Sequence, residues 1–220
     1  MIGKDKISPA VIGRLSRYYR FLRALNEEHV ERVSSAELAR MMDLTASQIR
    51  QDFNCFGGFG QQGYGYNVEY LFGELKKLLG AEEGYTAVIV GAGNLGAALA
   101  HAQTFTRRGV TVTAMFDISP ALLGTEVAGL PVYPPEELGR VYAERPFDIA
   151  VLCVPKDAAQ DCADRLTALG VKALWNFTGV EIRAPGDCIV ENVHLGDSLL
   201  TLSYKLRERR ENETEEQKKK

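Results

Sequence analysis

A glycine-rich turn between an apolar strand and a helix is the segment of this sequence best suited to bind a charged ligand. The apolar residues 88–90 lead into the motif GAGNLG at residues 91–96, and small helix-forming residues follow. In such a unit, Gly91 permits the tight turn, Gly93 lets the backbone approach a pyrophosphate, and Gly96 lets the helix lie close to the strand. The first turn of the helix offers free N–H groups and its positive dipole end to phosphates. The motif therefore predicts a dinucleotide site.

An acidic residue, Asp117, directly follows the next apolar strand, which we expect at residues 110–116. A carboxylate at this place hydrogen-bonds the ribose of the adenosine half and repels a 2′-phosphate. The two motifs together therefore favour NAD(H) over NADP(H). The alternative interpretation is a glycine-rich turn in an α/β domain that binds no ligand.

These motifs need a parallel sheet to position them, and the second half of the chain has the alternation that predicts one. After Asp117 we expect a short helical piece from Ser119, a strand at 130–133, a helix at 135–144, a strand at 149–154, a helix at 156–169, a strand at 171–175 and an edge strand at 188–191. Strands that alternate with helices form a mostly parallel sheet covered on both faces. Because ligands bind beyond the carboxyl ends of such strands, residues 91–96, 117, 154–155 and 176–177 should surround one crevice.

The first 66 residues predict a different module, built from short capped helices. Ser8 is positioned to cap a helix that starts at Pro9 and ends near Asn26, with apolar residues at three- and four-residue steps. Capping boxes at residues 34–37 and 45–48 begin two further helices separated by a short turn. This is the outline of a helix-turn-helix.

The last of these helices has a polar face suited to the major groove of DNA. Its members are Ser47, Gln48, Arg50, Gln51 and Asn54. Gln and Asn can read adenine, Arg can read guanine, and Ser can bind phosphate, although a solvated helix face would have the same composition. The following residues 56–66 hold five glycines and four aromatic residues, which favours a wing along the phosphate backbone over a flexible linker.

The chain ends in a helix of a third kind. Asp197 is positioned to cap it, and Leu199, Leu202, Tyr204 and Leu206 give it an apolar surface that must be buried either on its own domain or across a dimer. With a connecting helix at 68–79 and a polar joint at 80–84, the sequence divides into four parts. These are a DNA-binding domain at 1–80, a nucleotide-binding domain at 81–195, a dimerisation helix at 196–210 and a disordered tail at 211–220.

The composition is that of a globular chain, with 220 residues, 45% hydrophobic and 25% charged residues and a net charge of −3. No apolar run approaches the roughly 18 residues of a membrane span, and residues 1–10 lack the apolar core of a signal peptide, so we expect a cytoplasmic protein with no membrane partner. Cys55, Cys153, Cys162 and Cys188 lack metal-ligand spacing, which predicts reduced thiols and no metal. A reactive thiol is the alternative for Cys55, but we expect it to be buried.

Taken together, the capped helix pair, the segment QIRQDFNCFGGFGQQGYGY and the turn VIVGAGNLGAAL resemble the Rex family of redox-sensing transcriptional repressors. The resemblance covers about residues 8–207, in the same order, and includes the run Val-Glu-Asn-Val at 190–193. It implies an α/β fold class, with an N-terminal winged helix-turn-helix and a C-terminal Rossmann-like parallel-sheet domain. It also implies a homodimer formed by a domain-swapped terminal helix, a palindromic double-stranded operator, and release from that operator when NADH binds.

The resemblance also carries site residues over by position. The pyrophosphate would lie on Gly91, Ala92, Gly93, Asn94, Leu95 and Gly96, the ribose on Asp117, and the nicotinamide near Val154 and Pro155. The residues facing DNA would be Ser47, Gln48, Arg50 and Gln51, with Gly60, Gln61, Gln62, Gly63 and Tyr64 in the wing, which runs on to Tyr66. NAD+ has a cationic ring where NADH is neutral, so an apolar nicotinamide pocket would disfavour the oxidised form.

Three positions depart from the family pattern. The wing usually carries a basic residue where this chain has Gln61 and Gln62, which should weaken phosphate attraction and its salt dependence. A tyrosine that often follows the first turns of the glycine-loop helix is Ala102 here, and an aspartate able to pair with the equivalent of Arg20 is His194. We therefore expect normal dinucleotide binding but an altered sensing response.

Two other classes of function compete with a repressor. An NAD-dependent oxidoreductase or a CoA-binding enzyme fused to a helix-turn-helix would need an acid or base near the nicotinamide. The histidines of this half, His101 and His194, have no orienting partner evident in the sequence, so we predict no catalytic residues and no enzyme. The third reading is a winged-helix repressor whose α/β domain binds another nucleotide or serves only dimerisation, and Gly93 with Asp117 argues against it.

Overall fold

The computed structural model of the protein describes residues 9–55, 64–102 and 105–218. The chain forms two compact units, Met1–Glu83 and Gly84–Lys220, and the division lies within the polar joint at 80–84. No helix among the described residues is long and apolar enough to cross a membrane.

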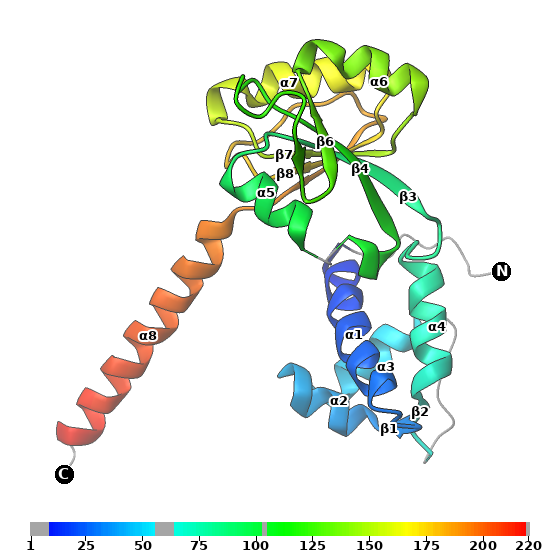
Figure 1. Cartoon of the computed structure of the whole chain (residues 1–220). Coiled ribbons are helices and arrows are strands. Elements are labelled where there is room, and N and C mark those ends of the chain that lie inside the picture. The colour runs from blue at the N-terminus through cyan, green and yellow to red at the C-terminus, as the bar shows by residue number, and fades with distance from the viewer. Residues whose placement is uncertain (1–8, 56–63, 103–104, 219–220) are drawn as a thin grey trace. The chain divides into compact units, whose positions relative to one another are not determined.

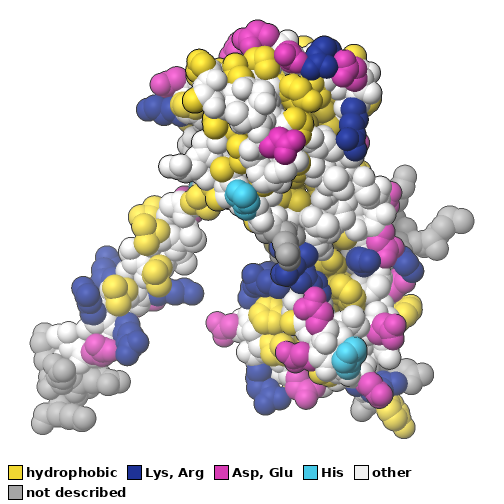
Figure 2. All heavy atoms as spheres, in the orientation of Figure 1, with side chains coloured by type: hydrophobic (Ala, Val, Ile, Leu, Met, Phe, Trp, Pro, Cys, Tyr) yellow, Lys and Arg dark blue, Asp and Glu magenta, His cyan; other side chains and the backbone are white. Residues whose placement is uncertain are grey.

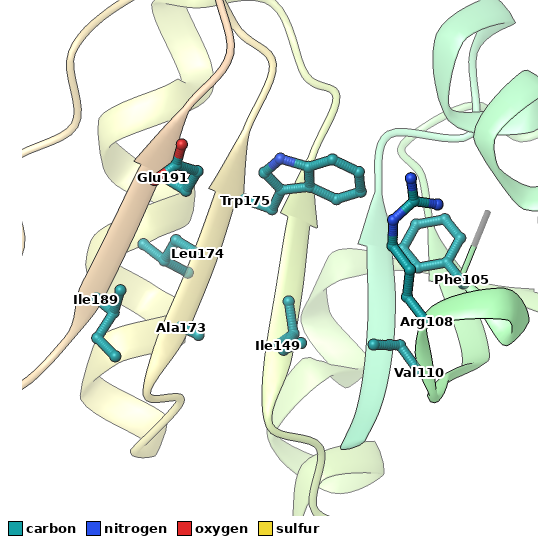
Figure 3. A pocket seen from close by; sticks show the side chains of 9 residues that line it. All are labelled: Phe105, Arg108, Val110, Ile149, Ala173, Leu174, Trp175, Ile189 and Glu191. Atoms are coloured by element: carbon teal, nitrogen blue, oxygen red, sulfur yellow. The ribbon is translucent and has the colours of Figure 1, made fainter. Parts of the chain in front are cut away.

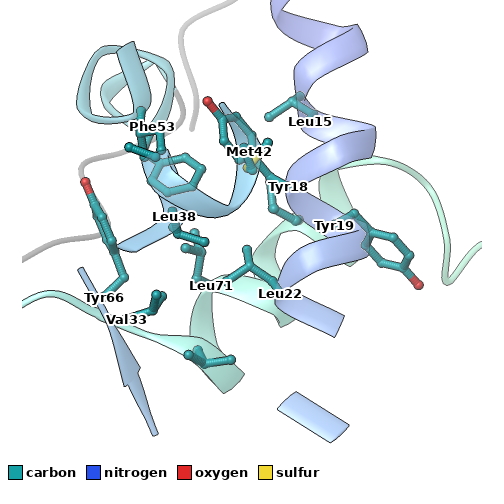
Figure 4. Close-up of a cluster of buried hydrophobic side chains, with 14 residues drawn as sticks. Leu15, Tyr18, Tyr19, Leu22, Val33, Leu38, Met42, Phe53, Tyr66 and Leu71 are labelled. Carbon is teal, nitrogen blue, oxygen red and sulfur yellow. The ribbon is translucent and has the colours of Figure 1, made fainter. Parts of the chain in front are cut away.

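The first unit is a small helical domain with a two-stranded sheet (Figure 1). Its elements are α1 (Pro9–Glu27), β1 (Arg32–Val33), α2 (Ser35–Met42), α3 (Ala46–Asn54), β2 (Tyr66–Asn67) and α4 (Val68–Leu78). The core of this unit gathers the apolar stripe of α1 against α2, α3 and α4, as Figure 4 shows for Leu15, Tyr18, Leu38, Met42 and Phe53. The Tyr18 and Phe53 rings lie 4.8 Å apart at their centroids, so α1 and α3 are joined directly through aromatic packing.

The helix-turn-helix forms as the caps predict. Ser34 and Glu37 exchange both bonds of a capping box at the start of α2, and Asp43 ends that helix in the left-handed conformation with φ 53°. Thr45 caps α3 by accepting a hydrogen bond from the Gln48 backbone N–H. The second capping box is only half formed. Among the described residues, the Gln48 side chain makes no return bond to Thr45 and donates to Asp52 instead.

The base of the predicted wing is present. β1 and β2 pair antiparallel, with Val33 opposite Tyr66. Gly65 has φ +70°, and a Cβ there would lie 2.9 Å from the Val33 carbonyl oxygen, so the glycine is required where the segment re-enters the domain. Residues 60–63 of the predicted wing, and Ser8 as the cap of α1, lie outside the described residues.

The second unit is a seven-stranded sheet in the order β5-β6-β4-β3-β7-β8-β9, parallel except for the edge strand β5. The strands are β3 (Tyr85–Val90), β4 (Val110–Phe116), β5 (Glu126–Val127), β6 (Leu130–Tyr133), β7 (Ile149–Leu152), β8 (Ala173–Asn176) and β9 (Ile189–Asn192). The helices are α5 (Asn94–His101), the 3₁₀ turns η1 (Thr106–Arg108) and η2 (Pro135–Glu137), α6 (Leu138–Glu144), α7 (Lys156–Leu169) and α8 (Leu195–Lys218).

The two faces of this sheet are covered unequally. α6 and α7 pack together on one face, against Val88 and Val90 of the central strand (Figure 1). α5 packs on the other face, where Ile89 points. Because successive residues of a strand face opposite sides, the run at 88–90 contributes to both cores. The prediction of a Rossmann-like parallel sheet is confirmed.

Several local predictions were wrong. The segment from Ser119 forms turns rather than a helical piece, and it leads into the short hairpin of β5 and β6. Cys55 is exposed, not buried, because it ends α3 on the side away from the core. The terminal helix begins at Leu195, before Asp197, and continues through Lys218. The predicted disordered tail is therefore helical over residues 211–218, where i to i+4 ion pairs such as Arg209–Glu213 support the helix.

Candidate functional site

The turn between β3 and α5 is shaped by two glycines that the protein itself requires. Gly91 has φ +101°, and a Cβ on it would lie 2.5 Å from the Cys153 carbonyl oxygen of the neighbouring β7 segment. A Cβ on Gly96 would overlap the Gly91 carbonyl oxygen. These contacts explain the tight turn and the close approach of α5 to the sheet.

Gly93 differs from both of these glycines. A Cβ built there meets no heavy atom within 4 Å among the described residues, and φ is −66°, which any residue adopts. It is the N-cap of α5 and supplies no side-chain cap, so the first N–H groups of the helix, at Asn94, Leu95 and Gly96, are left for another acceptor. No contact within the described residues therefore requires glycine at position 93.

Asp117 lies beside this turn, at the carboxyl end of β4. Its Oδ2 accepts a hydrogen bond from the Ala92 backbone N–H at 2.6 Å, and its Oδ1 accepts one from the Ser119 N–H at 2.8 Å. The carboxylate is half-buried, and the next residue, Ile118, is 82% exposed. The second predicted motif is therefore joined to the first through the backbone.

The carboxyl ends of β7 and β8 were predicted to line the same crevice, and they differ in what they offer a ligand. Val154 is half-buried, and Pro155 begins α7. Asn176 is buried with its amide fully engaged: Nδ2 donates to the Val180 carbonyl and to Asn192 Oδ1, and Oδ1 accepts from Thr178. Asn176 consequently holds the ends of β8 and β9 together and offers no free polar atom to a ligand.

The two histidines of the second unit differ in their surroundings. His194 Nε2 lies 3.0 Å from Glu181 Oε1, a partner that sequence reasoning missed, and Asn192 donates to the other oxygen of Glu181. His101 is exposed at the end of α5. Among the described residues, no group of three or more His, Cys, Asp or Glu side chains could hold a metal ion.

The thiols of the second unit are shielded. Burial raises the pKa of Cys153 to about 11 and that of Cys162 to about 11. Burial is also the main cause that raises the pKa of Cys188. These residues act as apolar core members at neutral pH, as expected.

The exposed face of α3 carries the residues predicted to face DNA. Ser47, Arg50 and Gln51 are exposed, and Arg50 Nη1 donates to Ser35 Oγ of α2 at 3.1 Å. Gln48 is only half-exposed because its side chain turns toward Asp52. At the wing, Tyr64 is 71% exposed, and its carbonyl accepts a hydrogen bond from Arg32.

Asp52 belongs to the segment that carries the family resemblance, but the sequence reasoning gave it no role, and it lies behind this surface. It is buried at 1% exposure, on the side of α3 that also carries Ile49 and Phe53. Both its oxygens accept from Arg14 of α1, at 2.6 and 2.8 Å, and Oδ2 also accepts from the Tyr18 hydroxyl at 2.8 Å. A carboxylate within the apolar stripe of a helix, opposite an arginine beside the stripe of α1, was the available signal.

The first half of α8 is an exposed apolar surface. Leu195, Leu199, Leu202 and Leu206 recur at steps of four, three and four residues and are 63%, 63%, 61% and 49% exposed. Figure 2 shows these apolar side chains gathered on the helix, with Arg and Lys side chains after them. Leucines at this spacing form one stripe, which is the pattern of a helix that packs against a partner.

A second apolar surface lies on the same face of the sheet as α5, over strands that α5 does not cover. A groove of about 220 Å³ is lined by Phe105, Val110, Ile149, Trp175 and Ile189, among others, and Arg108 and Glu191 lie at it. In Figure 3 side chains from neighbouring strands and from η1 face this groove, and the Phe105 and Trp175 rings meet edge to face at 5.7 Å.

Comparison with known proteins places both units in one family. Residues 6–54 match the family model "Putative DNA-binding protein N-terminus", and residues 82–180 match the model "CoA binding domain". The redox-sensing transcriptional repressor Rex of Thermoanaerobacter pseudethanolicus is 50% identical over 208 residues, covering 94% of this chain and 93% of that protein. The repressor of the same name from Clostridioides difficile is 47% identical over 94% of this chain and 99% of its own length.

Solved structures agree with these relatives. The crystal structure of RSP in complex with β-NAD+ and operator DNA has a TM-score of 0.86 and 49% identity, covering 96% of this chain and 97% of that chain. RSP in complex with β-NADH has a TM-score of 0.88 and 45% identity, covering 96% and 99%. RSP is described as a Rex-family repressor. Sequence and fold therefore agree over nearly the whole length, and this chain belongs to the Rex family of redox-sensing transcriptional repressors.

Proposed function

We propose that this protein is a transcriptional repressor that binds operator DNA through its first unit and is released when NADH binds to its second. The observation that carries the proposal is Gly93, a glycine that no contact within the described chain requires, at the start of a helix whose first N–H groups are uncapped. A bound pyrophosphate would supply both the steric requirement and the missing acceptor. Because this nucleotide site and a helix-turn-helix lie on one chain, the bound nucleotide would act as a signal that controls DNA binding.

The residues around this turn fit NAD(H). Asn94, Leu95 and Gly96 would donate backbone N–H groups to the pyrophosphate, and Asp117, already held by the Ala92 N–H, would accept from the ribose hydroxyls. The dinucleotide supplies a nicotinamide ring that is neutral when reduced and cationic when oxidised. The half-buried Val154 and the apolar Pro155 would disfavour the cation, because an uncompensated charge is costly to bury.

The DNA surface would consist of α3 and the wing. Ser47, Gln48, Arg50 and Gln51 would enter the major groove, while Gly60, Gln61, Gln62, Gly63 and Tyr64 would follow the backbone. A solved relative, RSP, was crystallised with operator DNA, which supports this assignment by homology. A repressor acts where chromosomal DNA is present, so the proposal places the protein in the cytoplasm.

The proposal includes a homodimer formed through α8. The leucine stripe of α8 is exposed within one chain, and a helix carrying this much apolar surface needs a partner. The uncovered groove at Trp175 and Ile189 offers an apolar surface of the same chemistry. Two copies would present two helix-turn-helix units, which suits a palindromic operator.

The response to redox state depends on residues outside the nucleotide turn. His194 stands where the family usually has an aspartate, and its ring is paired with Glu181 of the same unit. Ala102, the C-cap of α5, has only a methyl group where the family often has a tyrosine. We infer that coupling between NADH and DNA affinity is weaker here, while nucleotide binding itself is retained.

The decisive experiment is operator binding by the purified protein, titrated with NADH and separately with NAD+. The operator is first selected from a random duplex library by the nucleotide-free protein. NADH should lower the DNA affinity more than NAD+ does, since a ligand shifts a two-state equilibrium only through its differential affinity for the two states. Equal DNA affinity with and without both nucleotides would refute the sensor.

An enzyme is the alternative that needs its own test. The named relatives are transcriptional repressors, and in the second unit His194 beside Glu181 is the histidine whose chemistry the test would probe. Hydride transfer to a metabolite panel, monitored by NADH absorbance, should stay at the rate without protein. Turnover with any substrate would favour the oxidoreductase.

A further inference from the structure

The hydrogen bond from Gln48 to Asp52 constrains what Gln48 can present to another molecule. Asp52 Oδ1 and the Gln48 side-chain amide lie 3.3 Å apart, one helical turn from each other on α3. An ionised carboxylate only accepts hydrogen bonds, so the amide atom that faces it must be the nitrogen. The carbonyl oxygen of Gln48 is then the atom on the free side of the amide.

Asp52 is itself held in one place and in one ionisation state. Arg14 makes two bonds to its two oxygens, and Tyr18 makes a third. Burial alone would raise the pKa of Asp52, but the hydrogen bonds from Arg14, Tyr18 and Gln48 outweigh burial and hold it below its ordinary value. At neutral pH the carboxylate cannot become a donor, so the amide of Gln48 is not free to exchange its nitrogen and oxygen.

We propose that Asp52 is a positioning residue that fixes the Gln48 amide with its oxygen outward, so that Gln48 selects adenine at one operator position. This proposal rests on the proposed function, in which α3 reads DNA. The outward Oε1 accepts from an exocyclic amino group in the major groove, and the second hydrogen of Nε2 can donate to a neighbouring acceptor. Adenine offers both through N6 and N7, cytosine offers only its amino group, and guanine and thymine place a carbonyl oxygen there.

A freely rotating glutamine would not discriminate in this way. If the amide could reverse, its nitrogen would donate to O6 of guanine or O4 of thymine as readily as its oxygen accepts from adenine. The specificity therefore comes from the buried network behind α3, and Arg14 and Tyr18 of α1 contribute to it without touching a base.

The experiment uses the full-length protein and the operator selected by the wild type. The position read by Gln48 is the one whose base preference disappears in Gln48→Ala, and duplexes carrying each of the four bases there are compared by their Kd. For the wild type we expect at least about tenfold tighter binding to adenine than to guanine or thymine. Asp52→Asn, whose amide can donate as well as accept, should shrink that ratio to about twofold or less while the other operator positions keep their preferences.

Two further variants separate positioning from folding. Tyr18→Phe removes one bond to Asp52 but leaves the Gln48 contact, so the preference for adenine should persist. Gln48→Glu presents only acceptors and cannot donate to Asp52, so it gives the base preference of acceptors alone, with amino-bearing bases above guanine and thymine and cytosine level with adenine. If Asp52→Asn does not fold, the wild-type preference decides the question, because an amide held with its oxygen outward cannot favour guanine or thymine.

The outcomes distinguish the positioning role of Asp52 from the proposed function of the protein. A wild-type preference for guanine or thymine, or an unchanged adenine-to-guanine ratio in folded Asp52→Asn, would overturn the positioning role. Gln48→Ala with every base preference intact would also overturn it. Failure of the wild type to bind any duplex sequence-specifically would overturn the proposed function instead.

Discussion

The two candidate binding surfaces of this protein treat hydrogen bonds in opposite ways. At the turn after β3, the chain leaves the first N–H groups of α5 without a side-chain cap. On α3, it binds the side chain of Gln48 to a buried carboxylate. A phosphate is recognised by backbone donors that must be available, whereas a base edge is recognised by a side chain that must be oriented. A surface with free backbone donors therefore suits a diffusible ligand. A surface whose side chain is held by a buried carboxylate, which we call the braced surface, suits the reading of a DNA sequence.

The largest loss of stability is expected at the glycine turn. Gly96→Ala adds a methyl group that overlaps the Gly91 carbonyl oxygen, and because backbone cannot yield cheaply we expect the second unit to lose roughly 3 kcal/mol or more of stability. Gly93→Ala adds the same methyl group into open space, so its stability cost should be at most about 1 kcal/mol. Urea unfolding followed by circular dichroism measures both.

For the affinity for NADH we expect the opposite order. Relative to the stability that each variant loses, Gly93→Ala should lose more NADH affinity than Gly96→Ala. Gly93→Ala should remain folded and bind NADH at least about tenfold more weakly, a change of about 1.4 kcal/mol, because the methyl group would lie against the pyrophosphate. Gly93→Val should bind more weakly still. Full NADH affinity in a folded Gly93→Val protein would remove the pyrophosphate from this turn.

The stability of the braced surface on α3 should depend on the buried ion pair between Asp52 and Arg14. Asp52→Ala leaves Arg14 and Tyr18 without their acceptor, and breaking a buried ion pair costs about 3 kcal/mol, which we expect as a lower denaturation midpoint of the first unit. Because the pKa of Asp52 is held below its ordinary value in the folded state, its contribution is complete above the unfolded pKa of about 4 and is lost as pH falls through the folded pKa. Acid titration of wild type and Asp52→Asn measures this, and a variant that shows the same acid-induced loss would contradict it.

What the sequence could predict differs between the two surfaces for a physical reason. The turn is specified locally, since strand, glycines, helix and Asp117 follow one another, and the structure brings them together. Asp52, by contrast, depends on α1, whose Arg14 is 38 residues away along the chain, and the pattern of α3 alone does not say which helix supplies the partner of this carboxylate. The Glu181 partner of His194 escaped prediction for the same reason, because it comes from the segment between β8 and β9.

Helix ends showed a related limit. The capping boxes predicted the starts of α2 and α3 correctly because their bonds are local. The length of α8 was underestimated because charge composition was read as disorder, whereas pairs such as Arg207–Glu211 and Arg209–Glu213 are spaced to support a helix. Propensity over such a segment does not distinguish an exposed helix from a coil.

The link between the two surfaces should depend on the leucine stripe of α8. Leu202→Ala removes one leucine from each copy, and at about 2 kcal/mol for each the dimer should weaken by about 4 kcal/mol, or roughly 1,000-fold in its Kd, because burial of a leucine contributes at least that much. Lys205→Ala, an exposed neighbour off the stripe, is the matched control. Sedimentation equilibrium measures both, and a wild type that stays monomeric at micromolar concentration would exclude the dimer.

Restoring the family residues should strengthen the coupling between NADH binding and DNA binding. The double variant Ala102→Tyr and His194→Asp supplies the two side chains that the family often has, while losing the ring that pairs with Glu181. We expect NADH to lower DNA affinity about tenfold more in this variant than in the wild type, which lies within the usual range of allosteric coupling. The Kd for NADH measured without DNA is the control, and an equal NADH effect on both proteins would show that neither position limits sensing.

The smallest effect should come from the wing, where the chain carries Gln61 and Gln62 in place of the usual basic residue. Gln61→Lys adds one charge that a phosphate can neutralise, so the plot of log Kobs against log salt should steepen by about 0.9, with only a few-fold gain in affinity at moderate salt. Since a phosphate contact carries no base information, the gain should be equal for the selected operator and for each of its single-base variants. This outcome would separate the wing, which adds affinity, from the braced α3, which adds discrimination, and an increase confined to the selected operator would show that the wing also reads sequence.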